Sequence, residues 1–365
     1  MIAKRLAILT SGGDAPGMNA AIRAATLVGV AQGWTVLGVE RGYTGLMEGE
    51  FRPLEPGDVG SIIRDGGTML GSTRCAAFTT AEGRATARRR LADARIGAVL
   101  VIGGNGSLAG AACLADPAEA PDAPRVIGLP ASIDNDVGVT SLAIGVDTAM
   151  NTIMEACDRI ADTASAHDRA FIVEVMGRDS GYLAMATSVA VGADLVLFRE
   201  DGRTVEAHVE RVVEAIIAAR RRPTGRRRAL IIKAEGVALP AQELKARVDA
   251  RLRAIAGDVA ETEVRVTVLG HVVRGGRPTA FDRMMASRLG HAGVRALIDG
   301  ATRAMVAWAP ALTPDDATRS PVDPRCWLVP LDTMLAETRR LLTGESPTVQ
   351  WRTRVFDVID GALKL

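Results

Sequence analysis

Short aliphatic runs alternate along this chain with longer segments of helical periodicity, and this alternation constrains the fold more than any other feature. We expect strands at 6–10, 35–39, 98–102, 126–129, 170–176, 195–198, 229–233 and 265–269, and helices at 16–33, 80–94 and 107–115. Such alternation is typical of parallel sheets with helices on both faces. Strands buried on both faces read as short, wholly apolar runs, as these do. The predicted fold class is therefore α/β.

The size and composition of the chain indicate two domains with aliphatic cores. A length of 365 residues exceeds what one core usually supports, and aromatic residues make up only 3 % of the chain. The net charge of +1 gives no general attraction to nucleic acid or to an anionic membrane surface. The four cysteines form no C-x-x-C pair, which favours reduced thiols in a cytoplasmic protein. No apolar run approaches the roughly 20 residues of a membrane span, and the first is too short for a signal peptide.

Glycine-rich loops follow several of the predicted strands. They are TSGGDAPGMN at 10–19, GGTMLGSTR at 66–74 and GGNGS at 103–107. In a doubly wound sheet, ligands bind at the carboxyl ends of the strands, where glycines and helix N-termini suit a phosphate chain. Arg74 at the end of its loop adds a guanidinium that can face a phosphate. The sequence contains neither G-x-G-x-x-G nor G-x-x-x-x-G-K-[ST], which argues against a nicotinamide-binding fold and a P-loop kinase.

A further loop, PASIDND at 130–136, places Asp134 and Asp136 one residue apart. Paired acids serve as Mg²⁺ ligands, or as one base and one ligand. Beside phosphate-binding loops they suggest phosphoryl transfer, in which one carboxylate accepts the proton of the acceptor hydroxyl. Because Asp-Asn-Asp also occurs in ordinary turns, this stretch alone does not settle the chemistry.

Six blocks together resemble the 6-phosphofructokinase family. They are ILTSGGDAPGMNAAIR, GGTMLGSTR, IGGNGS, LPASIDND, VEVMGRDSG and VLGHVVRGG, in the family's order. The resemblance implies a phosphofructokinase-like fold with two α/β domains: a nucleotide-binding domain of 1–145 plus 273–325, and a sugar-phosphate-binding domain of 146–272 plus 326–365. It implies a cytoplasmic kinase of glycolysis that uses ATP and Mg²⁺ to phosphorylate the 1-hydroxyl of fructose 6-phosphate. The expected assembly is a homotetramer or homodimer, with active sites at a subunit interface and with no nucleic acid or membrane partner.

The resemblance also implies roles for individual residues. Asp134 is the expected base, Ser132 lies beside the transferred phosphate, and Arg178 offsets transition-state charge. The expected nucleotide ligands are Gly13, Arg74, Cys75, Gly104, Asn105, Gly106 and Ser107, and the expected metal ligands are Asn105 and Asp136. The expected sugar-phosphate ligands are Ser132, Asp134, Asp136, Arg169, Met176, Gly177, Arg178, Glu235, Arg265, His271 and Arg274, of which Arg169 and Arg265 would come from a neighbouring subunit.

Asn105 departs from the family pattern, which has an acid at this position. Three interpretations are open: the metal relies on the two aspartates, water and phosphate; nucleotide affinity is lower; or the chain is a catalytically weak paralogue that senses nucleotide and sugar phosphate. Gly106 and Ala131 are small and uncharged, whereas pyrophosphate-dependent relatives carry a bulkier acid and a lysine there. The sequence therefore favours ATP, with a pyrophosphate-dependent enzyme as the alternative.

Other features remain open. Arg23, Arg226 and Arg228 match a family effector site, but Leu27, Pro56 and Ala161 stand where regulated members have arginines, so the familiar nucleotide switch is not expected. The basic segment at 220–228 is interpreted as a helix end and turn, with polyanion binding as the alternative. Sugar specificity and the role of residues 313–325 do not follow from the sequence.

Overall fold

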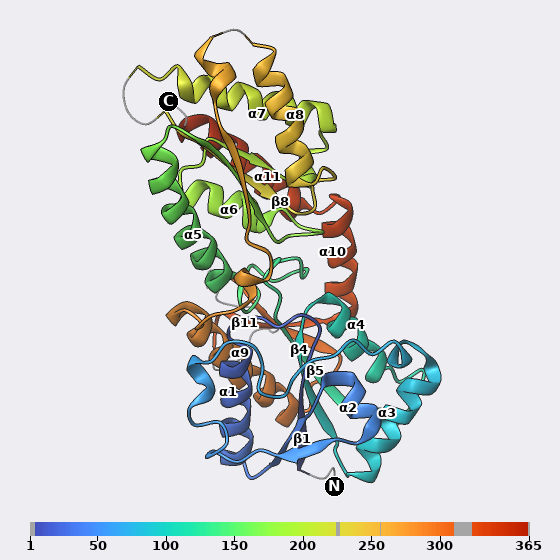
Figure 1. The fold of residues 1–365 in the computed structure, drawn as a ribbon. Coiled ribbons are helices and arrows are strands. Elements are labelled where there is room, and N and C mark those ends of the chain that lie inside the picture. The colour runs from blue at the N-terminus through green and yellow to red at the C-terminus, as the bar shows by residue number, and fades with distance from the viewer. Residues whose placement is uncertain (1–3, 224–226, 256, 310–322, 364–365) are drawn as a thin grey trace. The chain divides into compact units, whose positions relative to one another are not determined.

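The computed structural model describes residues 4–223, 227–255, 257–309 and 323–363. The chain divides into two compact units, each with its own sheet (Figure 1). Unit 1 comprises Met1–Thr148 and Arg274–Leu341, and unit 2 comprises Ala149–Val273 and Leu342–Leu365. The predicted α/β class with mostly parallel sheets is confirmed.

Unit 1 is built on a seven-stranded sheet in the order β11-β10-β5-β4-β1-β2-β3. Its strands are β1 (Arg5–Ser11), β2 (Thr35–Val39), β3 (Phe51–Pro53), β4 (Ala98–Gly103), β5 (Arg125–Pro130), β10 (Ala304–Trp308) and β11 (Cys326–Pro330). The five inner strands are parallel, and β3 and β11 close the edges as antiparallel strands. The carboxyl ends of β1, β4 and β5 therefore lie along one edge of the sheet.

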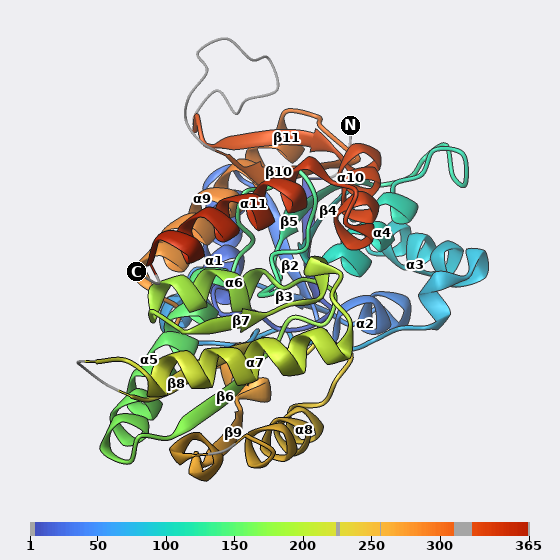
Figure 2. The same ribbon diagram turned by 90° about the horizontal axis from the view of Figure 1, so that it is seen from above.

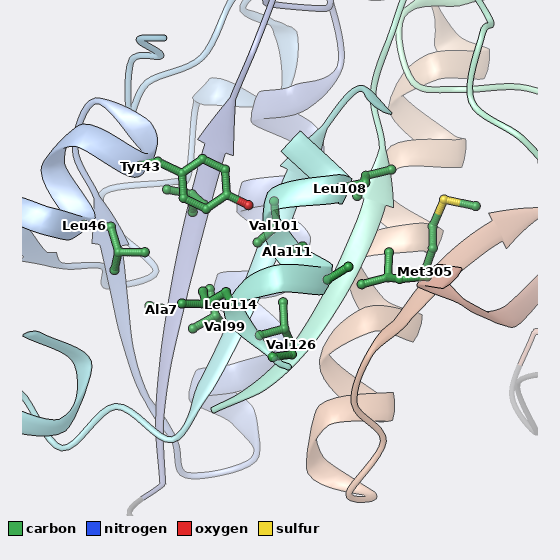
Figure 3. Close-up of a cluster of buried hydrophobic side chains, with 14 of the residues drawn as sticks. Ala7, Tyr43, Leu46, Val99, Val101, Leu108, Ala111, Leu114, Val126 and Met305 are labelled. Atoms are coloured by element: carbon green, nitrogen blue, oxygen red, sulfur yellow. The ribbon is translucent and has the colours of Figure 1, made fainter. Parts of the chain in front are cut away.

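Helices cover both faces of this sheet. They are α1 (Met18–Ala31), α2 (Gly42–Glu48), α3 (Ala81–Asp93), α4 (Asn105–Leu114), α9 (Ala280–Ile298) and α10 (Leu331–Thr343), with 3₁₀ turns η1 (Ile62–Arg64) and η2 (Ala77–Thr79). Helices α1 and α9 pack against each other on one face, and α2, α3 and α4 lie on the other (Figure 1). Figure 3 shows the core under α2 and α4, where Leu46, Leu108 and Leu114 meet Val99 and Val101 of β4. As predicted, this core is mainly aliphatic.

Unit 2 is built on a four-stranded parallel sheet in the order β7-β8-β6-β9. Its strands are β6 (Ala170–Val175), β7 (Leu195–Leu197), β8 (Ala229–Ala234) and β9 (Val264–Val268). Its helices are α5 (Val146–Ala166, whose first turn belongs to unit 1), α6 (Tyr182–Ala190), α7 (Val205–Arg220), α8 (Ala241–Arg253) and α11 (Pro347–Leu363), with 3₁₀ turns η3 (Arg199–Asp201), η4 (Asp258–Glu261) and η5 (Gly270–Arg274). Helices α7 and α8 lie beside each other (Figure 2). The core of this unit includes Ile172, Ile231 and Leu244.

All eight predicted strands are present, and each end lies within one residue of its predicted place. Two helix starts were wrong. Helix α1 begins at Met18 rather than Pro16, because Gly17 has the left-handed φ of 116°. Helix α4 begins at Asn105 rather than Ser107, so most of the predicted glycine loop is a helical first turn.

One predicted domain boundary was also wrong. Residues 326–341 were assigned to the second domain, but they belong to unit 1. The reason is that β11 pairs with β10 and extends the seven-stranded sheet, and α10 follows directly from it. The predicted loop at 310–322 lies outside the described residues.

The four cysteines are free, and burial raises the pKa of the Cys157 and Cys326 thiols to about 12. Within the described residues, no helix has both the length and the apolar character that crossing a bilayer requires. In the basic segment, Arg220 ends α7 and pairs with Asp168, and Arg222 pairs with Asp194. These contacts support a helix end and turn; residues 224–226, including Arg226, lie outside the described part of the chain.

Candidate active site

Three loops meet at the carboxyl edge of the unit 1 sheet, where parallel strands commonly place ligands. A Cβ on Gly12, after β1, would lie 3.0 Å from Ser107 Oγ, after β4. A Cβ on Gly104 would lie 3.7 Å from Ser132 Cβ, after β5. The Ser72 hydroxyl joins a fourth loop to this edge, because it donates to the Gly12 carbonyl at 2.6 Å. The loops singled out in the sequence therefore lie side by side.

These loops enclose a pocket of about 550 Å³. Predicted residues that line it are Gly13, Arg74, Cys75, Gly104, Asn105, Gly106, Ser107, Ser132, Asp134 and Arg274. Further lining residues that were not predicted as ligands are Ser11, Gly12, Tyr43, Thr73, Phe78, Thr79, Arg84, Ala109, Gly110, Cys113 and Ala131; of these, Ser11, Gly12, Thr73 and Ala131 lie within the motifs quoted from the sequence. The prediction thus covered the glycine-rich wall, which is formed by Gly13 and residues 104–107. It omitted the aromatic wall, which is formed by Tyr43 and Phe78.

The first turn of α4 forms part of the glycine-rich wall. Gly104 precedes the helix in extended conformation, and Asn105, Gly106 and Ser107 make the first turn. Backbone N–H groups in the first turn of a helix have no partner within the helix and favour an anion. A Cβ on Gly106 would meet no heavy atom within 4 Å, so this position borders open space.

The aromatic wall comes from α2 and η2. The rings of Tyr43 and Phe78 stack with centroids 4.0 Å apart. The Tyr43 hydroxyl donates to the Ser107 carbonyl at 2.7 Å, which ties this wall to the first turn of α4. Burial raises the pKa of Tyr43, so the hydroxyl stays protonated as a donor. A Cβ on Gly110 would lie 2.9 Å from the Tyr43 ring, so α4 needs glycine there.

The loop with the two acids is held by the residue between them. Asn135 is fully buried and adopts a left-handed φ of 49°. Its amide donates to the Ser141 carbonyl and accepts from the Ala143 N–H, both at 3.1 Å. This buried clamp places Asp134 on the pocket lining and turns Asp136 toward α4.

Asp136 accepts hydrogen bonds from two side chains. Ser132 Oγ donates to one carboxylate oxygen at 2.7 Å, and Asn105 Nδ2 donates to the other at 2.8 Å. Among the residues that the structure describes, no group of three or more His, Cys, Asp or Glu side chains gathers as a metal site. Mg²⁺ nevertheless is commonly held by one or two carboxylates plus water and phosphate oxygens. The oxygen atoms of Asp136, Asn105 and Ser132 fit that kind of shared site.

Arg274, predicted as a ligand of the sugar 6-phosphate, belongs to unit 1 and lines this pocket. A Cβ on Gly13 would lie 2.6 Å from Arg274 Nη1, and the same nitrogen donates to the Asp14 carbonyl at 3.3 Å. Glycine at position 13 therefore makes room for this guanidinium.

In unit 2, several predicted sugar ligands lie at the carboxyl ends of the strands. Met176, Gly177 and Arg178 follow β6, Glu235 follows β8, and His271 follows β9 in η5. The two loops after β6 and β8 are in direct contact, because the Glu235 N–H donates to the Val175 carbonyl at 2.9 Å and the Gly236 N–H donates to the Gly177 carbonyl at 3.2 Å.

A buried lysine supports this pair of loops. Lys233 is fully buried at the end of β8, and its ammonium donates to Glu174 at 2.8 Å and to the Ala234 carbonyl at 3.1 Å. Lys233 was not predicted as a site residue, although it is one of only four lysines in the chain.

Arg169 and Arg265 are not brought together with the other predicted sugar ligands of unit 2. Arg169 directly precedes β6, Arg265 is the second residue of β9, and both pair with Glu263. Because β6 has six residues, its two ends lie roughly 20 Å apart. These arginines therefore lie near the edge of the sheet opposite to Met176 and Glu235.

Comparisons with known proteins agree with this arrangement. A family model described as phosphofructokinase matches residues 5–297. The ATP-dependent 6-phosphofructokinase of Thermotoga neapolitana is 45% identical over 307 residues, which are 83% of this chain and 89% of the relative. An ATP-dependent 6-phosphofructokinase of Thermus thermophilus is 46% identical over 303 residues, with the same coverage. The phosphofructokinase of Pichia pastoris superimposes with a TM-score of 0.83 at 30% identity; the match covers 99% of this chain but only 38% of the yeast chain.

Proposed function

The chain belongs to the phosphofructokinase family, and we propose that it is an ATP-dependent 6-phosphofructokinase. It would transfer the γ-phosphoryl group of ATP to the 1-hydroxyl of fructose 6-phosphate and so form fructose 1,6-bisphosphate. The observation that carries the proposal is the unit 1 pocket, in which glycine-rich turns, an aromatic wall and Asp134 line one space of about 550 Å³.

The shape of this pocket supports a nucleotide donor over pyrophosphate. Pyrophosphate requires only the glycine-rich wall with its N–H groups and Arg74. Tyr43 and Phe78 stack on each other and are only 5% and 4% exposed, yet both line the pocket, so they give it an apolar end that suits a purine base. Open space at Gly106 leaves room for the α-phosphate and sugar of a nucleotide.

Phosphoryl transfer depends mostly on positioning and on neutralising charge. The first turn of α4 and Arg74 would bind the donor phosphates through N–H groups and a guanidinium. Asp134 would accept the proton of the sugar hydroxyl as that oxygen attacks the γ-phosphorus. Ser132 would orient the transferred group, and Arg178 would offset the charge that develops on it.

Asp136 and Asn105, with Ser132, would hold a magnesium ion together with the donor phosphates. Bound there, Mg²⁺ neutralises phosphate charge. The hydrogen bonds of Asp136 to Ser132 and Asn105 keep its carboxylate oriented toward α4 before any ion arrives.

For the sugar phosphate, we assign Met176, Gly177, Arg178, Glu235 and His271 of unit 2. Arg274, in unit 1, stays a predicted ligand of the 6-phosphate. A dianionic phosphate requires guanidinium or imidazole donors, and a carboxylate such as Glu235 accepts hydrogen bonds from sugar hydroxyls. We assign Arg169 and Arg265 to the 6-phosphate site of a neighbouring subunit, because within unit 2 they lie at the opposite strand ends. This assignment makes the enzyme a homo-oligomer.

A coupled assay of bisphosphate formation tests the proposal. Purified protein receives fructose 6-phosphate and Mg²⁺ with either ATP or pyrophosphate as donor. Turnover with ATP and none with pyrophosphate is the expected result. Preference for pyrophosphate would assign the alternative donor, and binding of both ligands without product would indicate a sensing protein.

Asp134→Asn separates catalysis from binding. We expect kcat to fall by roughly three orders of magnitude or more, since the base is lost, with little change in the KM for fructose 6-phosphate. If the variant turned over at the wild-type rate, Asp134 would not be the base.

A further inference from the structure

The loop between α4 and β5 carries an acid that reaches back toward the candidate donor pocket. Both carboxylate oxygens of Glu119 accept from Arg84 of α3, with Nε at 2.9 and 3.1 Å and Nη2 at 2.5 Å. Arg88, one turn later on α3, donates to the same carboxylate at 2.9 Å. The two guanidinium groups lower the pKa of Glu119 to about 2, so it is charged at every physiological pH. Bidentate pairing of this kind fixes the orientation of the Arg84 guanidinium as well as balancing its charge.

Arg84 is itself part of the pocket wall. It lines the pocket, and only 13% of its side chain is exposed. Its third nitrogen, Nη1, donates to the Thr79 carbonyl at 2.7 Å. Thr79 follows Phe78, the ring that stacks on Tyr43. Glu119, Arg84 and the aromatic wall therefore form one chain of contacts.

Arg88 connects the same acid to the far end of α4. Its Nε donates to the Leu114 carbonyl at 3.1 Å, and its Nη2 donates to the carbonyl of Cys113, which also lines the pocket. Glu119 thus ties α3 to α4, and both helices contribute to the pocket lining.

We propose that Glu119 is a positioning residue that holds Arg84 and the aromatic wall in place for the base and ribose of the nucleotide donor. The inference rests on the proposed function and deepens it, because it assigns part of the nucleotide selectivity to a loop outside the pocket. The hydrogen bonds of the Glu119 carboxylate go to Arg84 and Arg88 and to no residue of the glycine-rich wall, so the contacts with the donor phosphates should change least.

Glu119→Gln tests this role, because it removes the charge and keeps the size. The KM for ATP should rise about tenfold, while kcat and the KM for fructose 6-phosphate stay within twofold. Inhibition by inorganic tripolyphosphate, which has no base or ribose, should be unchanged. Glu119→Asp keeps the charge and should recover part of the ATP affinity.

Asp122→Asn is the matched control, since it removes the same charge from the same loop; it should leave the KM for ATP unchanged. An unchanged KM for ATP in Glu119→Gln would overturn the proposal. So would equal weakening of ATP and tripolyphosphate, which would indicate a general effect of charge or folding. Calorimetric titration with ATP measures the same affinity without turnover. A wild-type protein that binds ATP but forms no product would therefore count against the proposed function alone.

Discussion

Replacing Asn105 by aspartate would place a second carboxylate against Asp136. The Asn105 amide now donates to Asp136 at 2.8 Å, so the variant loses a hydrogen bond and gains a like charge at that contact. Two unit charges about 4 Å apart repel by about 4 kcal/mol at an effective dielectric constant near 20. Rotation of the new side chain relieves part of this repulsion. We therefore expect Asn105→Asp to lower the free energy of unfolding by about 2 kcal/mol at neutral pH.

The loss should depend on pH in a defined direction. Repulsion raises the pKa of one carboxyl of the pair in the folded state above its unfolded value of about 4. The destabilisation is therefore complete above the raised pKa and disappears as the pH falls below the unfolded value. Mg²⁺ should also reverse it, because a cation between two carboxylates replaces repulsion with attraction.

Thermal unfolding at pH 8 and pH 4.5, with and without Mg²⁺, measures both effects. At pH 8 without Mg²⁺, the midpoint should fall by roughly 4–8 °C relative to wild type. Asn105→Ala is the control that loses the hydrogen bond but adds no charge, and its stability should not respond to Mg²⁺. If the aspartate and alanine variants were equally stable at pH 8, and neither responded to Mg²⁺, the proposed contact between positions 105 and 136 would be refuted.

Three further substitutions test other parts of the structure. Gly106→Asp should fold normally, since a Cβ there meets nothing within 4 Å, but should raise the KM for ATP at least tenfold by repelling the donor phosphates; unchanged kinetics would remove Gly106 from the donor site. Val139→Gly should raise the free energy of unfolding by about 1 kcal/mol, because a β-branched residue is strained at φ 66°. Denaturant unfolding measures this change, and a loss of stability would contradict the reasoning. Lys233→Met should lower the free energy of unfolding by about 3 kcal/mol, because Glu174 loses its buried partner. It should also raise the KM for fructose 6-phosphate more than the KM for ATP. Equal increases in the two KM values would show that Lys233 does not specifically support the loop that carries Glu235.

The sequence was sufficient for most of the sheet because the inner strands are buried on both faces. Every residue of β4 is buried, so polar residues do not interrupt the apolar run that predicts the strand. The strand Ala304–Trp308 is equally buried, yet it was missed, and so were the short edge strand Phe51–Pro53 and the antiparallel strand Cys326–Pro330. The last two are edge strands with partly exposed residues, which weakens the apolar pattern.

The candidate site was predictable where glycines and acids form continuous motifs. Tyr43, Phe78 and Arg84 were missed because each comes from a different element, and only the packing of α2, η2 and α3 brings them together. The available signal for the aromatic wall was Tyr43, one of two tyrosines in the chain, which lies between two glycine-rich motifs. For Asn105, the pattern indicated a weaker metal ligand but not its hydrogen bond to Asp136, which depends on the register of α4 against the loop after β5.

The position of β10 in the sheet affects how the chain assembles during synthesis. β5 finds its outer neighbour, β10, only after more than 170 residues of intervening chain have been made, whereas all four strands of the other sheet lie within that interval. A nascent chain therefore completes the four-stranded sheet of unit 2 before the seven-stranded sheet of unit 1. Until residue 308 emerges from the ribosome, the apolar edge of β5 stays unpaired. Chains truncated before Ala304 would keep that edge open, and we expect them to aggregate rather than persist as a shortened protein.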